Sequence, residues 1–212
     1  MLFLCCVTPT ICLSTETKEP MTLRIEPTFP TYDLIPGLGH PAYANVDVKA
    51  YFYNQSRESI ALANPSICYP AEFVGKESLN YKDVTKGKLE MVVLITTPDG
   101  REIKLKDLDL FFPEGAFHLA IAPGESKEIL LSKFSPYFNV ASWMIYDDKA
   151  ITEPLFGHPG TYQMTVAYKN IFPECLFNTE NGSETIKVWT GEVVSNTIEI
   201  EIKPDSSSNS HR

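Results

Sequence analysis

The sequence predicts an all-β protein built as an antiparallel β-sandwich, and three observations carry this prediction. Apolar and polar residues alternate along several short segments, which is the period of a half-buried strand. No long segment shows the apolar period of a helix. The chain also contains 16 prolines, which fit such a fold because proline is excluded from helix interiors and occupies turns and sheet edges.

The first half of the chain contains an early strand and the centre of the expected sheets. The early strand is expected at residues 23–27, and strict alternation predicts a second at 44–53. Residues 89–95 are almost wholly apolar, which is typical of a buried central strand. Thr97-Pro98-Asp99-Gly100 is a turn, because proline presets φ, aspartate bonds the local backbone and glycine accepts a positive φ. A return strand at 103–105 completes this hairpin.

The second half of the chain contains the clearest alternation. Residues 117–121 and 129–131 are expected to be strands separated by a turn. Residues 162–168 alternate over a longer stretch, and 198–202 places isoleucines between charged and polar residues. Roughly seven to nine short strands separated by such turns are typical of a sandwich.

Two connections, 63–87 and 132–159, are long for a sandwich, and short helical turns are expected near 72–77 and 133–142. Loops of this length are usually functional or carry short elements of their own. The second connection is rich in aromatic residues, and we take these as candidate binding residues: Tyr137, Phe138, Trp143, Tyr146 and Phe156. Exposed rings bind sugars or proteins by stacking and apolar burial. The alternative is that the segment folds down as a lid and its rings complete the core.

The 212 residues, 43% of them apolar, are sufficient for a packed core. We expect a leader and linker at residues 1–20, the sandwich at 21–204, and a flexible, Ser-rich tail at 205–212. No run of about 18 apolar residues is present, so no membrane span is expected.

The start of the chain favours export. Residues 2–13 are largely apolar, with the length of the apolar region of a secretory signal, although the usual preceding basic region is absent. A buried first strand or a disordered end is the alternative. Cys5 follows Leu2-Phe3-Leu4 in a pattern similar to a bacterial lipoprotein acylation site, so lipoprotein anchoring is a further alternative. The expected location is extracellular or at the cell envelope.

The chain has five cysteines, three of them in the leader. Removal of the leader would leave Cys68 and Cys175, and an even pair in an exported chain predicts a disulfide. Two separate buried thiols are the alternative. No Cys or His spacing matches a zinc site.

The charge and the motifs exclude several classes of function. A formal net charge of −9 argues against nucleic-acid binding, which requires clustered Lys and Arg. The histidines are scattered, and neither HExxH nor GxSxG is present, so no catalytic residue, metal or cofactor is expected. Asp147-Asp148 with Glu153 supplies oxygen ligands suited to calcium, but adjacent carboxylates more often form a solvated turn.

Three phrases of the sequence resemble those of exported bacterial sandwich domains. They are Ala122-Pro123-Gly124-Glu125-Ser126, Gly160-Thr161-Tyr162 and Trp189-Thr190-Gly191-Glu192-Val193-Val194-Ser195-Asn196. Tyr162 opens a strand, as in the tyrosine corner of immunoglobulin-like domains. The resemblance implies an immunoglobulin-like or fibronectin-III-like sandwich. Antibody domains have a cysteine where this chain has Met164, so the resemblance is to the broad class.

These features favour a non-catalytic, secreted or cell-envelope binding module that uses loop residues carried on rigid sheets. Its partner would be an unknown protein or glycan. A protease inhibitor that presents a long loop is one alternative. An accessory or structural domain of an exported system is the other.

Overall fold

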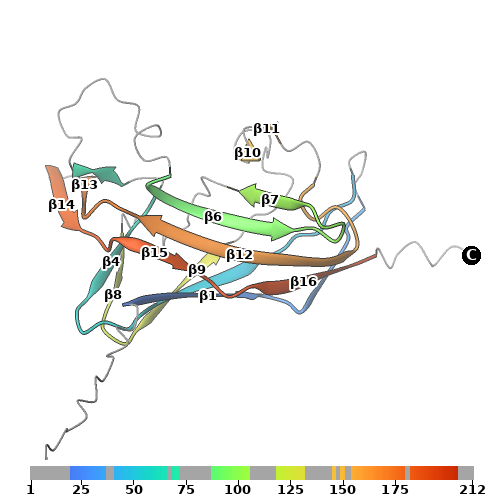
Figure 1. Cartoon of the computed structure of the whole chain (residues 1–212), viewed down its shortest axis with the longest axis horizontal. Helices are drawn as coiled ribbons and strands as arrows, with labels where there is room; N and C mark the ends of the chain where they lie inside the picture. Colours follow the sequence, from blue (N-terminus) through green and yellow to red (C-terminus); the bar gives the residue numbers. More distant parts are fainter. Residues whose placement is uncertain are drawn as a thin grey trace, which may run out of the picture.

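The computed structural model describes residues 20–36, 41–65, 68–71, 87–105, 118–131, 145–146, 149–150, 154–179 and 182–204. These residues form β-strands and turns without an α-helix (Figure 1), which confirms the all-β prediction. The described part contains no helix with the length and apolar character needed to cross a bilayer. Residues 1–19 of the expected leader and linker, the tail beyond Pro204 and the expected helical turns lie outside the described residues.

The described residues form two main sheets, which we call the small sheet and the large sheet. The small sheet has the order β1 (Met21–Pro27), β3 (Val48–Asn54), β9 (Ser126–Leu131). The large sheet has the order β2 (Thr31–Asp33), β16 (Ile198–Lys203), β12 (Gly160–Asn170), β6 (Leu89–Thr96), β7 (Glu102–Leu105), and β15 (Gly191–Val194) also pairs with β12. All pairs in these sheets are antiparallel except β2 with β16. This arrangement matches the predicted antiparallel design.

Three smaller pairings complete the structure. They are β5 (Tyr69–Pro70) with β13 (Glu174–Thr179) and β14 (Gly182–Lys187), β4 (Ile60–Ala63) with β8 (His118–Ile121), and β10 (Ile145–Tyr146) with β11 (Lys149–Ala150). The β10–β11 hairpin lies beside β7 of the large sheet (Figure 1).

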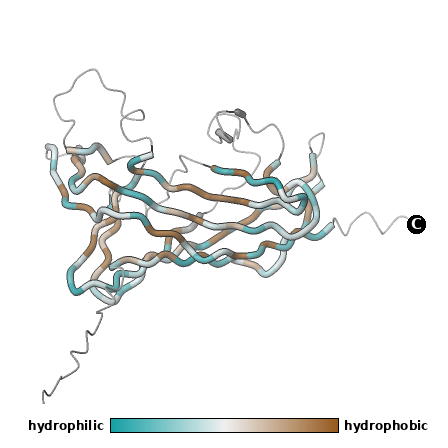
Figure 2. Tube along the Cα trace, in the orientation of Figure 1, coloured by the Kyte–Doolittle hydropathy of each residue, from teal (hydrophilic) through white to brown (hydrophobic). Residues whose placement is uncertain are grey.

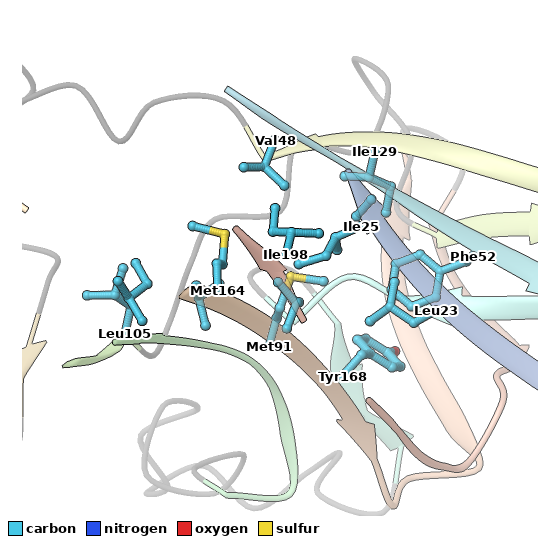
Figure 3. Packing of buried hydrophobic residues seen from close by; sticks show 14 of the residues in the cluster. Leu23, Ile25, Val48, Phe52, Met91, Leu105, Ile129, Met164, Tyr168 and Ile198 are labelled. Carbon is cyan, nitrogen blue, oxygen red and sulfur yellow. The ribbon is translucent and has the colours of Figure 1, made fainter. Parts of the chain in front are cut away.

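The inner faces of the two larger sheets share one hydrophobic core. Alternate residues of β3 and of β16 are buried, because successive side chains of a strand point to opposite faces. Phe52 from the small sheet meets Tyr168 from the large sheet edge to face, with ring centroids 5.5 Å apart. Figure 3 shows Met91, Met164 and Ile198 packed between the layers. Figure 2 shows hydrophobic stretches along the strands and hydrophilic residues at the turns that join them.

The Ala122–Ser126 phrase forms a tight turn that is tied to a buried asparagine. Gly124 has a φ of +75°, a conformation that glycine adopts without a side-chain clash, and its N–H donates to the Asn54 carbonyl at 2.9 Å. The Asn54 side chain is fully buried and donates to the carbonyls of Glu58 and Ile121. A buried amide with its donors satisfied fixes the two chain segments relative to each other.

The Gly160–Tyr162 phrase forms the expected corner at the start of β12. The Tyr162 hydroxyl donates to the His158 carbonyl at 3.1 Å, four residues upstream, as a tyrosine corner requires. Burial raises the pKa of Tyr162 above its ordinary value. The hydroxyl therefore remains protonated at neutral pH and keeps donating this bond.

The phrase from Trp189 to Asn196 forms β15 and joins the two larger sheets. The Asn196 side chain accepts a hydrogen bond from the Ile25 N–H at 2.9 Å and donates one to the Ile25 carbonyl at 3.1 Å. One amide side chain therefore pairs with the backbone of β1 as a neighbouring strand would. Trp189 stacks on Tyr168 at a centroid distance of 6.1 Å, and its indole lies against the Cα of Gly191.

We expect Gly191→Ala to lower the free energy of unfolding by about 1–3 kcal/mol, because φ strain and overpacking act together. Gly191 has a φ of +151°, and an added Cβ would lie 2.5 Å from Cζ2 of Trp189. Gly124→Ala is the matched control, since its φ is +75° with nothing within 4 Å, so it tests backbone strain alone. Urea unfolding of both variants measures the difference. An equal loss in the two variants would contradict the role assigned to the Trp189 contact.

A disulfide joins β13 to the residue that precedes β5. We call the sheet formed by β5, β13 and β14 the third sheet. Cys68 and Cys175 form a disulfide with a Cα–Cα distance of 5.4 Å, which confirms the predicted pairing. Cys175 lies on β13 and pairs with Pro70 of β5. Both cysteines are fully buried, so the bond belongs to the interior rather than to the surface.

Several strands of the structure were not predicted from the sequence. The β13–β14 hairpin pairs Thr179 with Gly182, and neither of its strands shows the alternation of apolar and polar residues on which the prediction relied. The predicted strand at 44–53 begins only at Val48. Ala44 and Val46 are buried, but the Ala44 N–H donates to the Phe156 carbonyl instead of entering the small sheet.

Candidate functional site

The structure places the five predicted binding residues differently. Tyr137, Phe138 and Trp143 lie outside the described residues. Tyr146 belongs to β10, beside β7, although its side chain is outside the described part. Phe156 is only 1% exposed and meets Tyr162 edge to face at 5.0 Å.

Phe156 is therefore a core residue, and its assignment as a binding ring was wrong. The segment around it is held against the body of the protein because its carbonyl accepts the Ala44 N–H at 2.9 Å. For this residue the alternative applies, in which the long connection contributes a ring to the core.

A different candidate binding surface lies on the outer face of the large sheet. Ala167 of β12 pairs with Val92 of β6 on one side and with Val194 of β15 on the other. Leu94 follows two residues after Val92 and pairs with Thr165. Because residues two apart share a face of a strand, these side chains form one apolar strip. We call Val92, Leu94, Ala167 and Val194 the apolar strip.

The strip combines strongly exposed and buried apolar side chains. Leu94 is 46% exposed and Val194 is 56% exposed. Val92 lies on the same row as Val194 and two residues before Leu94 on β6. It is only 6% exposed and lies outside the main core cluster. The strip therefore presents two exposed side chains, one on each of the strands that flank β12.

Polar and charged residues bound the strip on both sides. The next row across β6, β12 and β15 is Glu90, Lys169 and Glu192. Beyond Leu94 on the other side, Thr96 pairs with Gln163, which in turn pairs with Glu199. An apolar centre with a polar rim is the anatomy of a protein–protein interface.

The outer face of the small sheet has the opposite character. Its positions on β1, β3 and β9 are occupied mostly by polar residues and tyrosines: Thr22, Arg24, Glu26, Lys49, Tyr51, Tyr53, Ser126 and Glu128, with Leu130 at the position that pairs with Lys49. Both outer faces belong to antiparallel sheets of one protein. Neighbouring apolar residues on three strands are thus a feature of the large sheet, and β-strand formation does not require them.

The other exposed apolar residues do not extend the strip. Phe29 lies in the turn after β1, Ile35 lies beyond β2 and Ile171 follows β12. Apolar residues scattered singly over a surface are common. Among the exposed apolar residues that the structure describes, Leu94 and Val194 alone lie on strands that flank the same central strand, which makes the apolar strip the candidate site.

The chemistry available in the strip is apolar burial. It contains no titratable or nucleophilic side chain, and its neighbouring polar contact joins the hydroxyls of Thr165 and Thr197 at 2.9 Å. Within the described ranges, no group of three or more His, Cys, Asp or Glu residues is placed to hold a metal ion. The strip can therefore bind a partner but holds no group for bond-making chemistry.

The sequence contained one signal for this site. The run Leu89-Glu90-Met91-Val92-Val93-Leu94-Ile95 is apolar at nearly every position, which predicts a strand covered on both faces. The structure buries Met91, Val93 and Ile95 in the core but leaves Leu94 exposed on the other face. Of the two apolar residues on that other face, Val92 is buried and Leu94 is exposed to solvent.

Comparisons with known proteins add no family. No protein-family model and no curated protein matches the chain. A solved target of the Northeast Structural Genomics Consortium aligns over 91% of this chain and 92% of that chain, with 10% identity and a TM-score of 0.38. The putative ApaA protein from Bordetella pertussis aligns over 81% of this chain and 90% of that chain, with 14% identity and a TM-score of 0.33. These scores are too low to assign a fold or a function.

Proposed function

We propose that the chain is an immunoglobulin-like sandwich that acts as a non-catalytic binding module outside the cell or at its envelope. Strand order supports the fold class. The small sheet β1-β3-β9 corresponds to the order A-B-E, and β16-β12-β6-β7 corresponds to G-F-C-C′ of the variable type. The tyrosine corner of Tyr162 stands at the start of β12, the position of strand F.

The buried Cys68–Cys175 bond supports an oxidising location. Disulfides persist in exported proteins and are rare where thiols are kept reduced. The bond carries no information about anchoring, so the proposal covers both a secreted and an envelope-attached form.

The single observation that carries the binding function is the exposed apolar strip. Covering Leu94 and Val194 would gain about 25 cal/mol for each Å² of apolar surface removed from water. A monomer without a partner gains nothing from apolar side chains at these exposed positions. The partner proposed is a protein that covers the strip with apolar side chains. Its rim would face Glu90, Lys169 and Glu192.

Site-specific photo-cross-linking in the native host tests this function. A cross-linking amino acid at position 194 is expected to give a discrete protein adduct, whereas the same probe at Glu128, on the outer face of the small sheet, should give none. Adding Leu94→Asp to the position-194 probe should lower the adduct by about tenfold or more, because the partner would have to desolvate a carboxylate. The melting temperature should change little, since Leu94 is a surface residue. Equal adducts at positions 194 and 128, or none at either, would contradict the proposal.

A further inference from the structure

The outer face of the small sheet carries two tyrosines surrounded by charged side chains. Tyr51 and Tyr53 lie two residues apart on β3 and therefore share one face, separated by about 7 Å along the strand. Tyr51 pairs with Arg24 on β1 and Glu128 on β9, while Tyr53 pairs with Thr22 and Ser126. We call this surface the tyrosine face.

The charged groups of the tyrosine face are balanced and bound to one another. The Arg24 guanidinium lies 3.7 Å from Glu26, and the Lys49 ammonium lies 3.3 Å from Glu128. Two cations and two anions cancel on this face, although the whole chain has a net charge of −9. The face therefore attracts neither a polyanion nor a polycation, and electrostatic complementarity favours an uncharged ligand.

The hydrogen-bonding groups of the face are held in place. The Tyr51 hydroxyl donates to Oε1 of Glu26 at 2.8 Å, and this bond raises the pKa of Tyr51 to about 12. Tyr51 thus remains a donor throughout the neutral range and positions the Glu26 carboxylate. A carboxylate offers about four lone-pair sites, so Glu26 retains acceptor capacity for a ligand.

We propose that the tyrosine face binds a neutral glycan chain. Sugar hydroxyls both donate and accept, and the carboxylates of Glu26 and Glu128 beside the Arg24 and Lys49 cations offer both complements. The Tyr53 ring, 39% exposed, supplies the flat apolar contact that a sugar ring needs. A flat sheet face suits an extended chain of sugar units better than a small molecule, which binds in concave sites. This inference is independent of the apolar strip.

Calorimetric titration with neutral hexasaccharides built of glucose, N-acetylglucosamine, galactose or mannose units tests the proposal, with a hexagalacturonate as the anionic probe. Saturable binding of at least one neutral probe is expected. Raising sodium chloride from about 0.1 M to about 1 M should leave that affinity unchanged, although it shortens the Debye length from about 10 Å to about 3 Å.

Variants separate the tyrosine face from other surfaces. Tyr53→Ala should weaken the bound neutral probe by about tenfold, as loss of a central aromatic contact does, whereas Tyr53→Phe keeps the ring and should stay within a few-fold of wild type. Leu94→Ala, on the apolar strip, should have no effect. The proposal is overturned if none of the neutral probes binds, if only the anionic probe binds, or if Tyr53→Ala binds as tightly as wild type. Unchanged circular dichroism spectra would show that the variants are folded.

Discussion

Removing the Cys68–Cys175 bond is expected to lower the free energy of unfolding by about 4–5 kcal/mol. The two cysteines are 107 residues apart, and a cross-link over a loop of this length strongly restricts the unfolded chain. A typical domain has a total stability of only about 5–15 kcal/mol. The loss should therefore move the unfolding transition close to physiological temperature.

The measurement is urea unfolding of a chain in which Cys5, Cys6 and Cys12 are replaced by serine, so that only one pair can form. The oxidised protein, the reduced protein and the Cys68→Ala, Cys175→Ala double variant are compared. The reduced protein keeps both side chains and isolates the bond itself, while the double variant adds the loss of packing at two fully buried positions. A difference below about 1 kcal/mol between oxidised and reduced protein would contradict the prediction.

The location of the disulfide also indicates which strands would become less stable if the bond were reduced. Cys175 begins the pairing of β13 with β5, and the third sheet has only three short strands. Because β5 has only two residues, this sheet is close to a two-stranded hairpin, which is marginally stable by itself. We therefore expect amide exchange in β13 and β14 to increase on reduction more than exchange in β12, the central strand of the large sheet.

The sequence was a good guide to strands that have one buried face. Ile198, Ile200 and Ile202 alternate with polar residues, and the structure buries all three isoleucines. Such strands are predictable because a shift of one residue would expose the entire apolar set. The short strands β2 and β5 carry too few residues for any period to be visible.

Strand neighbours, in contrast, could not be predicted from local pattern. Val92 and Val194 belong to one strip only because Ala167 on β12 pairs with both of their strands. The same limit applies to the tyrosine face, where Tyr51 meets Glu26 and Glu128 through two separate strand pairings. Both surfaces arise from long-range register, which a single sequence leaves open.

Phe156 shows why aromatic content alone did not identify a binding site. The residue lies in a segment rich in rings, and each ring there suits a core or a partner equally well. What decides its role is a backbone hydrogen bond to Ala44, a residue far away in the chain. The surface that we propose for a protein partner is formed by aliphatic side chains on strands.

Phe156→Ala is expected to destabilise the protein by about 3–5 kcal/mol, the range for removing a buried phenylalanine. The ring is 1% exposed and packs against Tyr162 at 5.0 Å, so its loss leaves a cavity next to the tyrosine corner. Phe156→Leu keeps most of the volume and should cost less. Phe29→Ala is the surface control, because Phe29 is 55% exposed. It should cost only about 0.5–1.5 kcal/mol, since its ring contacts Tyr32 edge to face.

Urea unfolding and photo-cross-linking together distinguish a core ring from a binding ring. If Phe156 serves the core, Phe156→Ala lowers the unfolding midpoint, while the adduct formed from position 194 persists at temperatures where the variant remains folded. If Phe156 instead contacted a partner, the variant would keep its midpoint and lose the adduct. Since the Tyr162 hydroxyl bonds the His158 backbone, just beyond Phe156, Tyr162→Phe combined with Phe156→Ala should show a non-additive loss, as residues in contact do. Strict additivity of the two substitutions would contradict a coupling between the Phe156 ring and the Tyr162–His158 hydrogen bond.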